Sequence, residues 1–182
     1  NLFQSGRTSS VKGSLAFDTR NNRIFPSRGV LIGGTVEHAA EYTGSTNLFT
    51  RLSGYGRAYF PFFDNWVFKL NLEVGFIASP NPQGVPIFER YFTGGINSVR
   101  GYEPRSLGPR LKVPDLNDPA FLRADFNIGG NKEMVFNAEI EIPIVSKIGI
   151  KGVVFFDAGN AFDDSEEINP ANLRMSWGFG FR

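Results

Sequence analysis

Three carboxylates and one arginine are the residues of this sequence whose types and spacing could do chemistry. Glu139 and Glu141 stand two positions apart, and Asp157 follows in the next stretch of alternating apolar and polar residues. Because side chains two positions apart share one face of a β-strand, we expect the three acids to lie close together across one hairpin. Such acids repel one another unless a cation lies among them. Lys151 and Arg100 are the candidate cations, and a solvated Arg100 is the alternative.

Other kinds of chemistry find little support in the sequence. His38 is the only histidine and there is no cysteine, so we expect neither a Ser-His-Asp triad nor a metal site built on histidine or thiolate. Glu139 and Glu141 could be the two acids of a glycosidase, but neighbouring acids on one strand are more often structural. We expect no enzyme, no metal and no cofactor. Three aspartates fit no known calcium loop and are expected to be solvated: Asp115, Asp118 and Asp125.

Arg100 lies in a long segment, residues 78–130, that has turn residues throughout and no sustained helical or strand period. Connections of this length are uncommon in compact proteins, and they usually carry function or are disordered. The apolar side chains in this segment argue against a solvated chain, and Gly94, Gly95 and Gly101 supply backbone freedom between them. We therefore predict a packed functional loop anchored by Phe88, Tyr91, Phe92, Ile96, Val99, Tyr102 and Leu107.

Segments of alternating apolar and polar residues surround this loop. The clearest is 66–77, where Trp66, Phe68 and Leu70 begin an apolar face and Lys69 and Asn71 lie opposite. Strict alternation over this length predicts a β-strand about as long as one that spans a membrane. We predict seven strands at about 11–18, 30–40, 47–59, 66–77, 133–142, 148–157 and 173–182, with turns at Pro61 and Pro143 and a polar loop from Ala158 to Asn172.

The composition agrees with β-structure and argues against a nucleic-acid partner. The chain has 182 residues with 19 Phe and 21 Gly, and no apolar run is long enough to form a transmembrane helix. A transmembrane barrel is not excluded by this, because its strands are shorter and alternate. The net charge of +1 and the lack of a basic stripe predict no nucleic-acid partner.

Alternation alone leaves two architectures open. One is a water-soluble sandwich whose apolar face is the core, and the other is a membrane barrel whose apolar face meets lipid. Short connections at one end and long ones at the other are typical of outer-membrane barrels and favour that architecture. Seven strands are too few and odd in number to close a bacterial barrel. We expect residues 1–182 to be one partial domain, all-β and antiparallel, from a larger transmembrane barrel.

Several stretches of the chain resemble the BamA family of outer-membrane assembly factors. The segment Tyr91-Phe-Thr-Gly-Gly-Ile-Asn-Ser-Val-Arg-Gly-Tyr102 is similar to the sixth extracellular loop of that family. The similarity continues through Gly129-Gly130-Asn131 and through Phe155-Phe-Asp-Ala-Gly-Asn-Ala-Phe162. It covers nearly the whole chain, and the Val-Arg-Gly-Tyr motif is specific to the wider superfamily.

The resemblance implies a fold and a function. The parent would be a sixteen-stranded barrel that folds and inserts other β-barrel proteins into the outer membrane of a Gram-negative bacterium. Its partners would be nascent outer-membrane β-barrel proteins, accessory assembly lipoproteins and outer-membrane lipids. A TamA-like protein, a two-partner secretion pore and a passive channel are the alternatives.

The resemblance also assigns roles to residues. The loop at 78–130 is expected to fold into the barrel lumen, where its motif Val99-Arg100-Gly101-Tyr102 would bring Arg100 to acids on the wall. Glu139 and Asp157 match the acidic positions of the family. Supporting roles fall to Gly94, Gly95 and Glu141.

Overall fold

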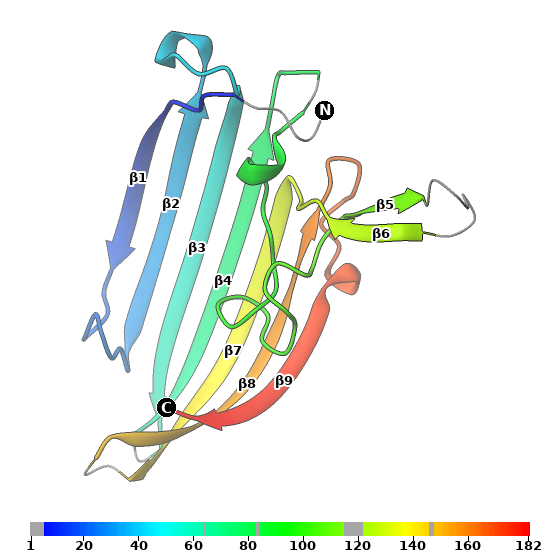
Figure 1. Ribbon diagram of the computed structural model, residues 1–182. Helices are drawn as coiled ribbons and strands as arrows, with labels where there is room; N and C mark the ends of the chain where they lie inside the picture. The colour runs from blue at the N-terminus through cyan, green and yellow to red at the C-terminus, as the bar shows by residue number, and fades with distance from the viewer. Residues whose placement is uncertain (1–5, 64, 83, 115–121, 146–147) are drawn as a thin grey trace.

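Seven antiparallel strands form one curved sheet in the computed structural model, which describes residues 6–63, 65–82, 84–114, 122–145 and 148–182 (Figure 1). The strand order is β1-β2-β3-β4-β7-β8-β9, so strands adjacent in the chain pair in the sheet, apart from the segment between β4 and β7. This confirms the predicted all-β, antiparallel fold. The strands are β1 (Ser10–Asp18), β2 (Gly29–Ala39), β3 (Phe49–Phe62), β4 (Trp66–Ala78), β7 (Lys132–Val145), β8 (Ile150–Phe162) and β9 (Arg174–Phe181).

Two prolines that were expected to end strands lie inside them. β3 continues through Pro61 to Phe62, and β7 continues through Pro143 to Val145. A proline cannot donate a backbone hydrogen bond, so it fits a strand only where one side needs no partner. The ladder between β2 and β3 ends at Tyr59, and the ladder between β4 and β7 ends at Glu141. Each proline therefore lies just beyond the end of one of its neighbouring ladders.

The polar loop predicted from Ala158 begins five residues later than expected. Ala158 to Phe162 belong to β8, where they pair with Lys132 to Phe136 of β7. The sequence Ala-Gly-Asn-Ala interrupts the apolar alternation because its residues are small, but the backbone ladder does not depend on side-chain size. The expectation was wrong here because small residues hide the period of a strand.

A hairpin interrupts the long segment that was predicted to be irregular. β5 (Arg110–Pro114) and β6 (Leu122–Asn127) form a separate two-stranded sheet that projects from the main one (Figure 1). Leu111 pairs with Phe126 in its register, and Arg110 Nε lies 3.4 Å from Asp125 Oδ1. Asp125 is thus on a strand and in an exposed ion pair, rather than in a loop. Two further aspartates that were considered for calcium, Asp115 and Asp118, lie outside the described residues.

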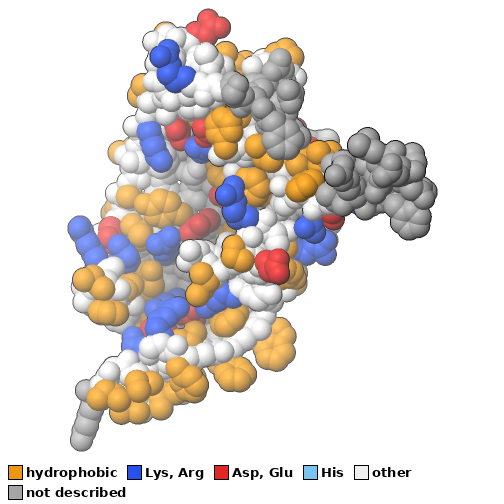
Figure 2. All heavy atoms as spheres, viewed as in Figure 1, with side chains coloured by type: hydrophobic (Ala, Val, Ile, Leu, Met, Phe, Trp, Pro, Cys, Tyr) orange, Lys and Arg blue, Asp and Glu red, His pale blue; other side chains and the backbone are white. Residues whose placement is uncertain are grey.

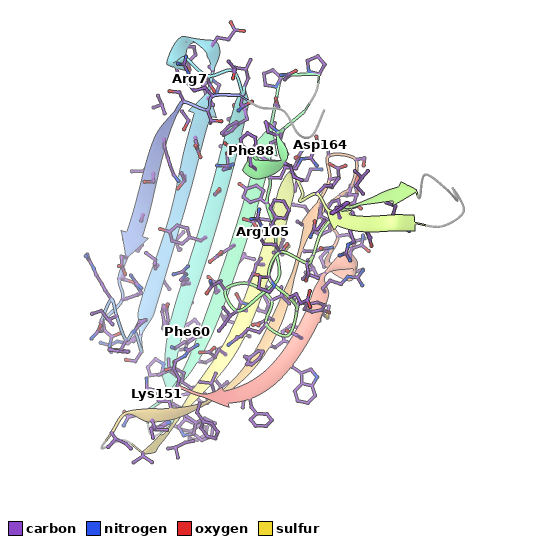
Figure 3. All side chains as sticks on the ribbon, viewed as in Figure 1. Arg7, Phe60, Phe88, Arg105, Lys151 and Asp164 are labelled. Atoms are coloured by element: carbon purple, nitrogen blue, oxygen red, sulfur yellow. The ribbon has the colours of Figure 1, made fainter. Side chains whose placement is uncertain are left out.

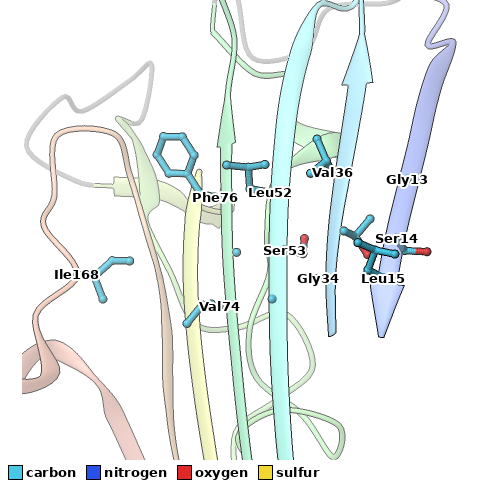
Figure 4. A pocket seen from close by; sticks show the side chains of 13 residues that line it. Gly13, Ser14, Leu15, Gly34, Val36, Leu52, Ser53, Val74, Phe76 and Ile168 are labelled. Carbon is cyan, nitrogen blue, oxygen red and sulfur yellow. The ribbon is translucent and has the colours of Figure 1, made fainter. Parts of the chain in front are cut away.

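The main sheet has two unlike faces. One face, called here the apolar face, exposes large apolar side chains along every strand; Leu15 is 86% exposed, Trp177 81% and Phe179 78%. Small residues in register, Gly34 beside Gly54 among them, leave a hollow of about 800 Å³ on this face, and Leu15, Val36, Leu52, Val74 and Phe76 line it (Figure 4). The opposite face, called the polar face, carries the charged side chains and is contacted by the loop that follows β4. Trp66, Phe68 and Leu70 belong to the apolar face, as their alternation predicted.

A small core lies where the loop leaves the sheet. Ala39, Phe49, Ile77 and Val85 are almost fully buried together, and Tyr91 packs against them. Val85 comes from the loop and the others from three strands, so this cluster fixes the start of the loop against β2, β3 and β4. No helix among the described residues is long and apolar enough to cross a membrane.

Candidate functional site

The loop after β4 is attached to the polar face before it reaches its arginine. Tyr91 exchanges two backbone hydrogen bonds with Gly130, of 2.9 and 2.8 Å, and its hydroxyl lies 3.0 Å from Ser53 Oγ. Its ring lies over Gly75, where a Cβ atom would come within 2.5 Å of the ring. Arg51 of β3 donates to the carboxylate of Glu89 at 2.8 Å. These contacts hold residues 89–91 against the sheet and set the direction of the residues that follow.

A tight turn then presents the motif. Gly94 has φ +105°, a left-handed conformation that favours glycine, and an added Cβ would lie 2.6 Å from Glu103 O. The Gly94 amide donates to Ser98 Oγ at 2.9 Å. Val99 is fully buried, and it fits because Gly159 of β8 has no side chain: a Cβ there would lie 2.8 Å from Val99 Cγ2. The turn is therefore docked on β8 immediately before Arg100.

Arg100 binds two carboxylates of the polar face. Its Nε donates to Asp157 Oδ2 at 2.7 Å and its Nη2 to Asp157 Oδ1 at 2.8 Å, a bidentate pair. Its Nη1 donates to Glu139 Oε2 at 2.9 Å, and its backbone amide donates to Asp157 Oδ2 at 3.0 Å. Hydrogen bonds to Asp157 raise the pKa of Arg100, outweighing the opposite effect of burial, and those to Glu139 add to the rise. The Asp157 side chain is 0% exposed, so its charge is balanced by the guanidinium rather than by water.

An aromatic ring supports the flat side of the guanidinium. Arg100 Cζ lies 3.6 Å from the centroid of the Phe155 ring, within the range of a cation–π contact. Phe155 lies on the same face as Glu139, with which it pairs in the register of β7 and β8. The ring has room because it covers Gly178 of β9, where an added Cβ would lie 2.6 Å from it. Loop, ring and glycine thus form three layers.

A row of hydrogen-bonded side chains crosses the sheet at the level of Asp157. The register aligns Arg57, Asn71, Asn137 and Asp157 on four neighbouring strands. Arg57 donates to Asn71 at 3.1 Å, Asn71 to Asn137 at 2.9 Å, and Asn137 to Asp157 at 2.8 Å. Asn137 also donates to Ser98 O at 2.6 Å. Asn137 therefore binds both the loop backbone and the acid that holds Arg100.

The third predicted acid belongs to a neighbouring cluster. Glu141 is buried and accepts from Lys151 Nζ at 2.9 Å, from Arg182 Nη1 at 3.1 Å, and from Lys69. Arg182 also donates to Glu139 at 2.8 Å, which links this cluster to the pair formed by Arg100. Lys151, a candidate cation for all three acids, contacts Glu141 and lies toward the end of the sheet with the β7–β8 turn (Figure 3).

The remaining motif residues border the same contact. Gly101 has φ +86°, and an added Cβ would lie 3.7 Å from Ser176. The Tyr102 hydroxyl donates to Met175 O of β9 at 3.3 Å. Gly95 has φ +101° and its amide donates to Val99 O at 3.1 Å. Within the described part of the chain, no group of three or more His, Cys, Asp or Glu side chains could hold a metal ion.

Sequence reasoning named Arg100 and its two acids but missed the residues that hold them. The alternation places Asn137, Phe155 and Gly178 on the polar face of their strands, but it does not reveal that they support the Arg100 contact. Lys69 and Arg182 fall on that face as well. Alternation along a strand assigns each side chain to a face, but it does not give the path of the loop across that face. The residues that the loop contacts could therefore not be predicted.

Comparison with known proteins gives a consistent result. A family model described as the Omp85 superfamily domain matches residues 4–182. The chain is 29% identical over 167 residues to the outer membrane protein assembly factor BamA of Nitratidesulfovibrio vulgaris, covering 88% of this chain and 20% of that protein. It is 31% identical over 147 residues to BamA of Neisseria meningitidis, covering 79% of this chain and 17% of that protein.

More distant similarities point the same way. A sorting and assembly machinery component 50 homolog of Bos taurus is 30% identical over 113 residues, which is 62% of this chain and 24% of that protein. The crystal structure of BamA from Haemophilus ducreyi lacking POTRA domains 1–3 superposes with a TM-score of 0.79 at 21% identity, covering 94% of this chain and 35% of that chain. The chain spans about a fifth of the length of the curated bacterial assembly factors that it matches.

Proposed function

This chain belongs to the Omp85 superfamily, and we propose that it is part of an assembly factor that folds and inserts β-barrel proteins into the outer membrane. The assembly factors and assembly-machinery components among its relatives support this proposal. The same relatives do not favour the TamA-like protein, the two-partner secretion pore or the passive channel that the sequence had left open.

The observation that carries the proposal is the attachment of the loop through Arg100. Its guanidinium joins one loop to two neighbouring strands, with Asp157 on β8 and Glu139 on β7. We propose that the polar face is the wall of the barrel lumen and that this contact braces the wall. A barrel that inserts other barrels must rearrange somewhere, and the brace would keep this part of it fixed. Breaking a buried ion pair on one side costs about 3–5 kcal/mol, enough for such a role.

We infer the protein partners from the relatives and the lipid partner from the apolar face of the sheet. Nascent outer-membrane β-barrel proteins would be the substrates, and accessory lipoproteins would complete the assembly complex. The exposed apolar side chains, Leu72, Val74 and Phe76 among them, would contact the acyl chains of outer-membrane lipids.

Charge reversal at Arg100 tests the proposal. The full-length protein that carries this chain is placed in lipid vesicles, and the folding rate of an unfolded β-barrel substrate is measured. Arg100→Glu puts a third carboxylate beside Asp157 and Glu139, so we expect the rate to fall about tenfold or more. Adding Asp157→Arg restores an opposite pair and should recover part of the rate.

A second arginine of the same loop provides the control. Arg105 stacks on the Phe92 ring with Cζ 4.1 Å from its centroid, and its side chain projects from the loop above the sheet (Figure 3). Arg105→Glu changes the charge of the loop equally without entering the Arg100 contact, and we expect a rate close to that of the unaltered protein. A folded Arg100→Glu protein that assembles substrate at the normal rate would show that the brace has no part in the function.

A further inference from the structure

A second feature of the polar face is a cavity beside the loop. It has a volume of about 390 Å³ and lies between the loop, the β1–β2 turn and strands β3, β4 and β7. This volume is within the range of small-molecule sites, about 300–1,000 Å³. Its charged lining consists of six cations and one acid: Arg20, Arg23, Arg57, Lys69, Arg100, Arg182 and Glu139.

Ion pairs around the cavity leave an excess of positive charge. Lys151 does not line the cavity, but it shares Glu141 with two of the lining cations, which brings the cations to seven. Their partners are five carboxylates, those of Asp18, Glu73, Glu139, Glu141 and Asp157, so two positive charges remain unbalanced. The pairs among the described residues are Arg20 and Arg23 with Asp18, Arg57 with Glu73, Lys69, Lys151 and Arg182 with Glu141, Arg182 and Arg100 with Glu139, and Arg100 with Asp157. Figure 2 shows Lys and Arg side chains gathered on this side of the molecule.

Two of these cations are weakly held. The Arg23 side chain is 85% exposed, and its Nε lies 3.7 Å from Asp18 Oδ2, beyond hydrogen-bond distance. Arg57 pairs with Glu73 at 3.0 Å, but both side chains are more than a third exposed, so water screens the pair. The Arg23 guanidinium can therefore turn toward a ligand at little cost, whereas Arg57 keeps its Nε bond to Asn71 and would present the rest of its guanidinium to a ligand. Arg20, in contrast, holds Asp18 in a bidentate pair.

We propose that this cavity binds a phosphate group of the monoester class. Such a group carries about two negative charges at neutral pH and three acceptor oxygens, which matches the two unbalanced charges. The guanidinium fork of Arg binds phosphate oxygens in pairs, and a cavity with one sign of charge concentrates the opposite ion. Asn97 lines the same cavity and adds a neutral donor. The site stands on the cavity and its charges, and it does not depend on the proposed assembly function.

Binding of inorganic phosphate to the full-length protein in detergent tests the site directly. Isothermal titration at low ionic strength should give saturable binding that chloride at equal concentration does not displace. Arg23→Gln should weaken the affinity about tenfold or more, because one hydrogen bond to a charged group is lost. The double variant Arg23→Gln with Arg57→Gln removes both unbalanced charges and should abolish binding. Neither residue contacts Arg100 or Asp157, and Arg23 also lies outside the row of hydrogen bonds that leads from Arg57 to Asp157, so the single variant leaves the loop contact intact.

Lys112→Gln is the matched control, since Lys112 lies on the projecting β5–β6 hairpin away from the cavity. The affinity of the Lys112→Gln protein for phosphate should equal that of the unaltered protein. Absence of saturable binding, full competition by chloride, or an equal loss in Lys112→Gln would each overturn the site. A parallel titration with dioctanoyl phosphatidic acid, a lipid with a phosphate monoester headgroup, identifies the source: tighter binding of this probe supports a headgroup ligand, and tighter binding of inorganic phosphate supports a free one.

Discussion

At the scale of single residues, Arg100 has partners for its edge, for one flat side of its guanidinium and for its backbone amide. Two carboxylates meet its edge, the Phe155 ring covers its flat side, and its own amide binds Asp157. The acids could be predicted because alternation assigns each strand residue to a face. The ring and Asn137 could not, because their contacts with the loop depend on its path across that face.

Removing the space under the Phe155 ring should loosen the arginine contact. Gly178→Ala places a Cβ within 2.6 Å of the ring, so the ring must shift and the free energy of unfolding should fall by about 1–3 kcal/mol. Gly180→Ala, two residues along the same strand, meets no atom within 4 Å and should change little. Urea unfolding of the full-length protein in vesicles measures both. Equal values for the two variants would contradict this three-layer arrangement.

At the scale of elements, strands and loop were predictable to different degrees. The strands around Trp66 and Met134 follow alternation and were found, because burial of one face imposes a period of two. The end of β8 and the β5–β6 hairpin were missed, since small residues and short strands carry little period. The loop was recognised by its composition, but its docking depends on contacts such as Tyr91 over Gly75, which no local pattern encodes.

The tight turn before the motif should be the most sensitive point of the loop. Gly84 and Gly94 both have left-handed backbone, with φ +76° and +105°, so alanine is strained at either position by about 1 kcal/mol. A Cβ at Gly94 also lies 2.6 Å from Glu103 O, whereas the space at Gly84 is open. Gly94→Ala should therefore make the loop a target for protease near Val99, and Gly84→Ala should not. Equal cleavage rates would show that the turn does not fix the motif.

At the scale of the whole molecule, the superfamily and the bacterial relatives place this chain in the outer membrane of a Gram-negative bacterium. Alternation could not choose between a sandwich and a barrel, because both bury one face of each strand in something apolar. In the described structure the apolar face is exposed on all seven strands and the loop lies on the polar face instead. That is the arrangement of a sheet whose apolar side is met by lipid.

Neighbouring residues on opposite faces of β2 test this orientation. Val36 is 51% exposed on the apolar face, and Thr35 points to the face that the loop contacts. Val36→Arg should reduce the free energy of unfolding in vesicles by up to about 2–4 kcal/mol, the cost of a charge at the middle of the bilayer. Thr35→Arg should cost much less, because that side chain does not enter the lipid. A reversed order of the two costs would mean that the faces have been assigned the wrong way round.

The coupling between Arg100 and Asp157 tests the brace most directly. A double-mutant cycle with Arg100→Gln and Asp157→Asn in the full-length protein measures the free energy that the two side chains contribute together. A buried bidentate pair predicts a coupling of at least about 1.5 kcal/mol, and the parallel cycle with Arg105→Gln in place of Arg100→Gln should give a value near zero. A coupling within about 0.5 kcal/mol of zero for Arg100 and Asp157 would contradict the brace.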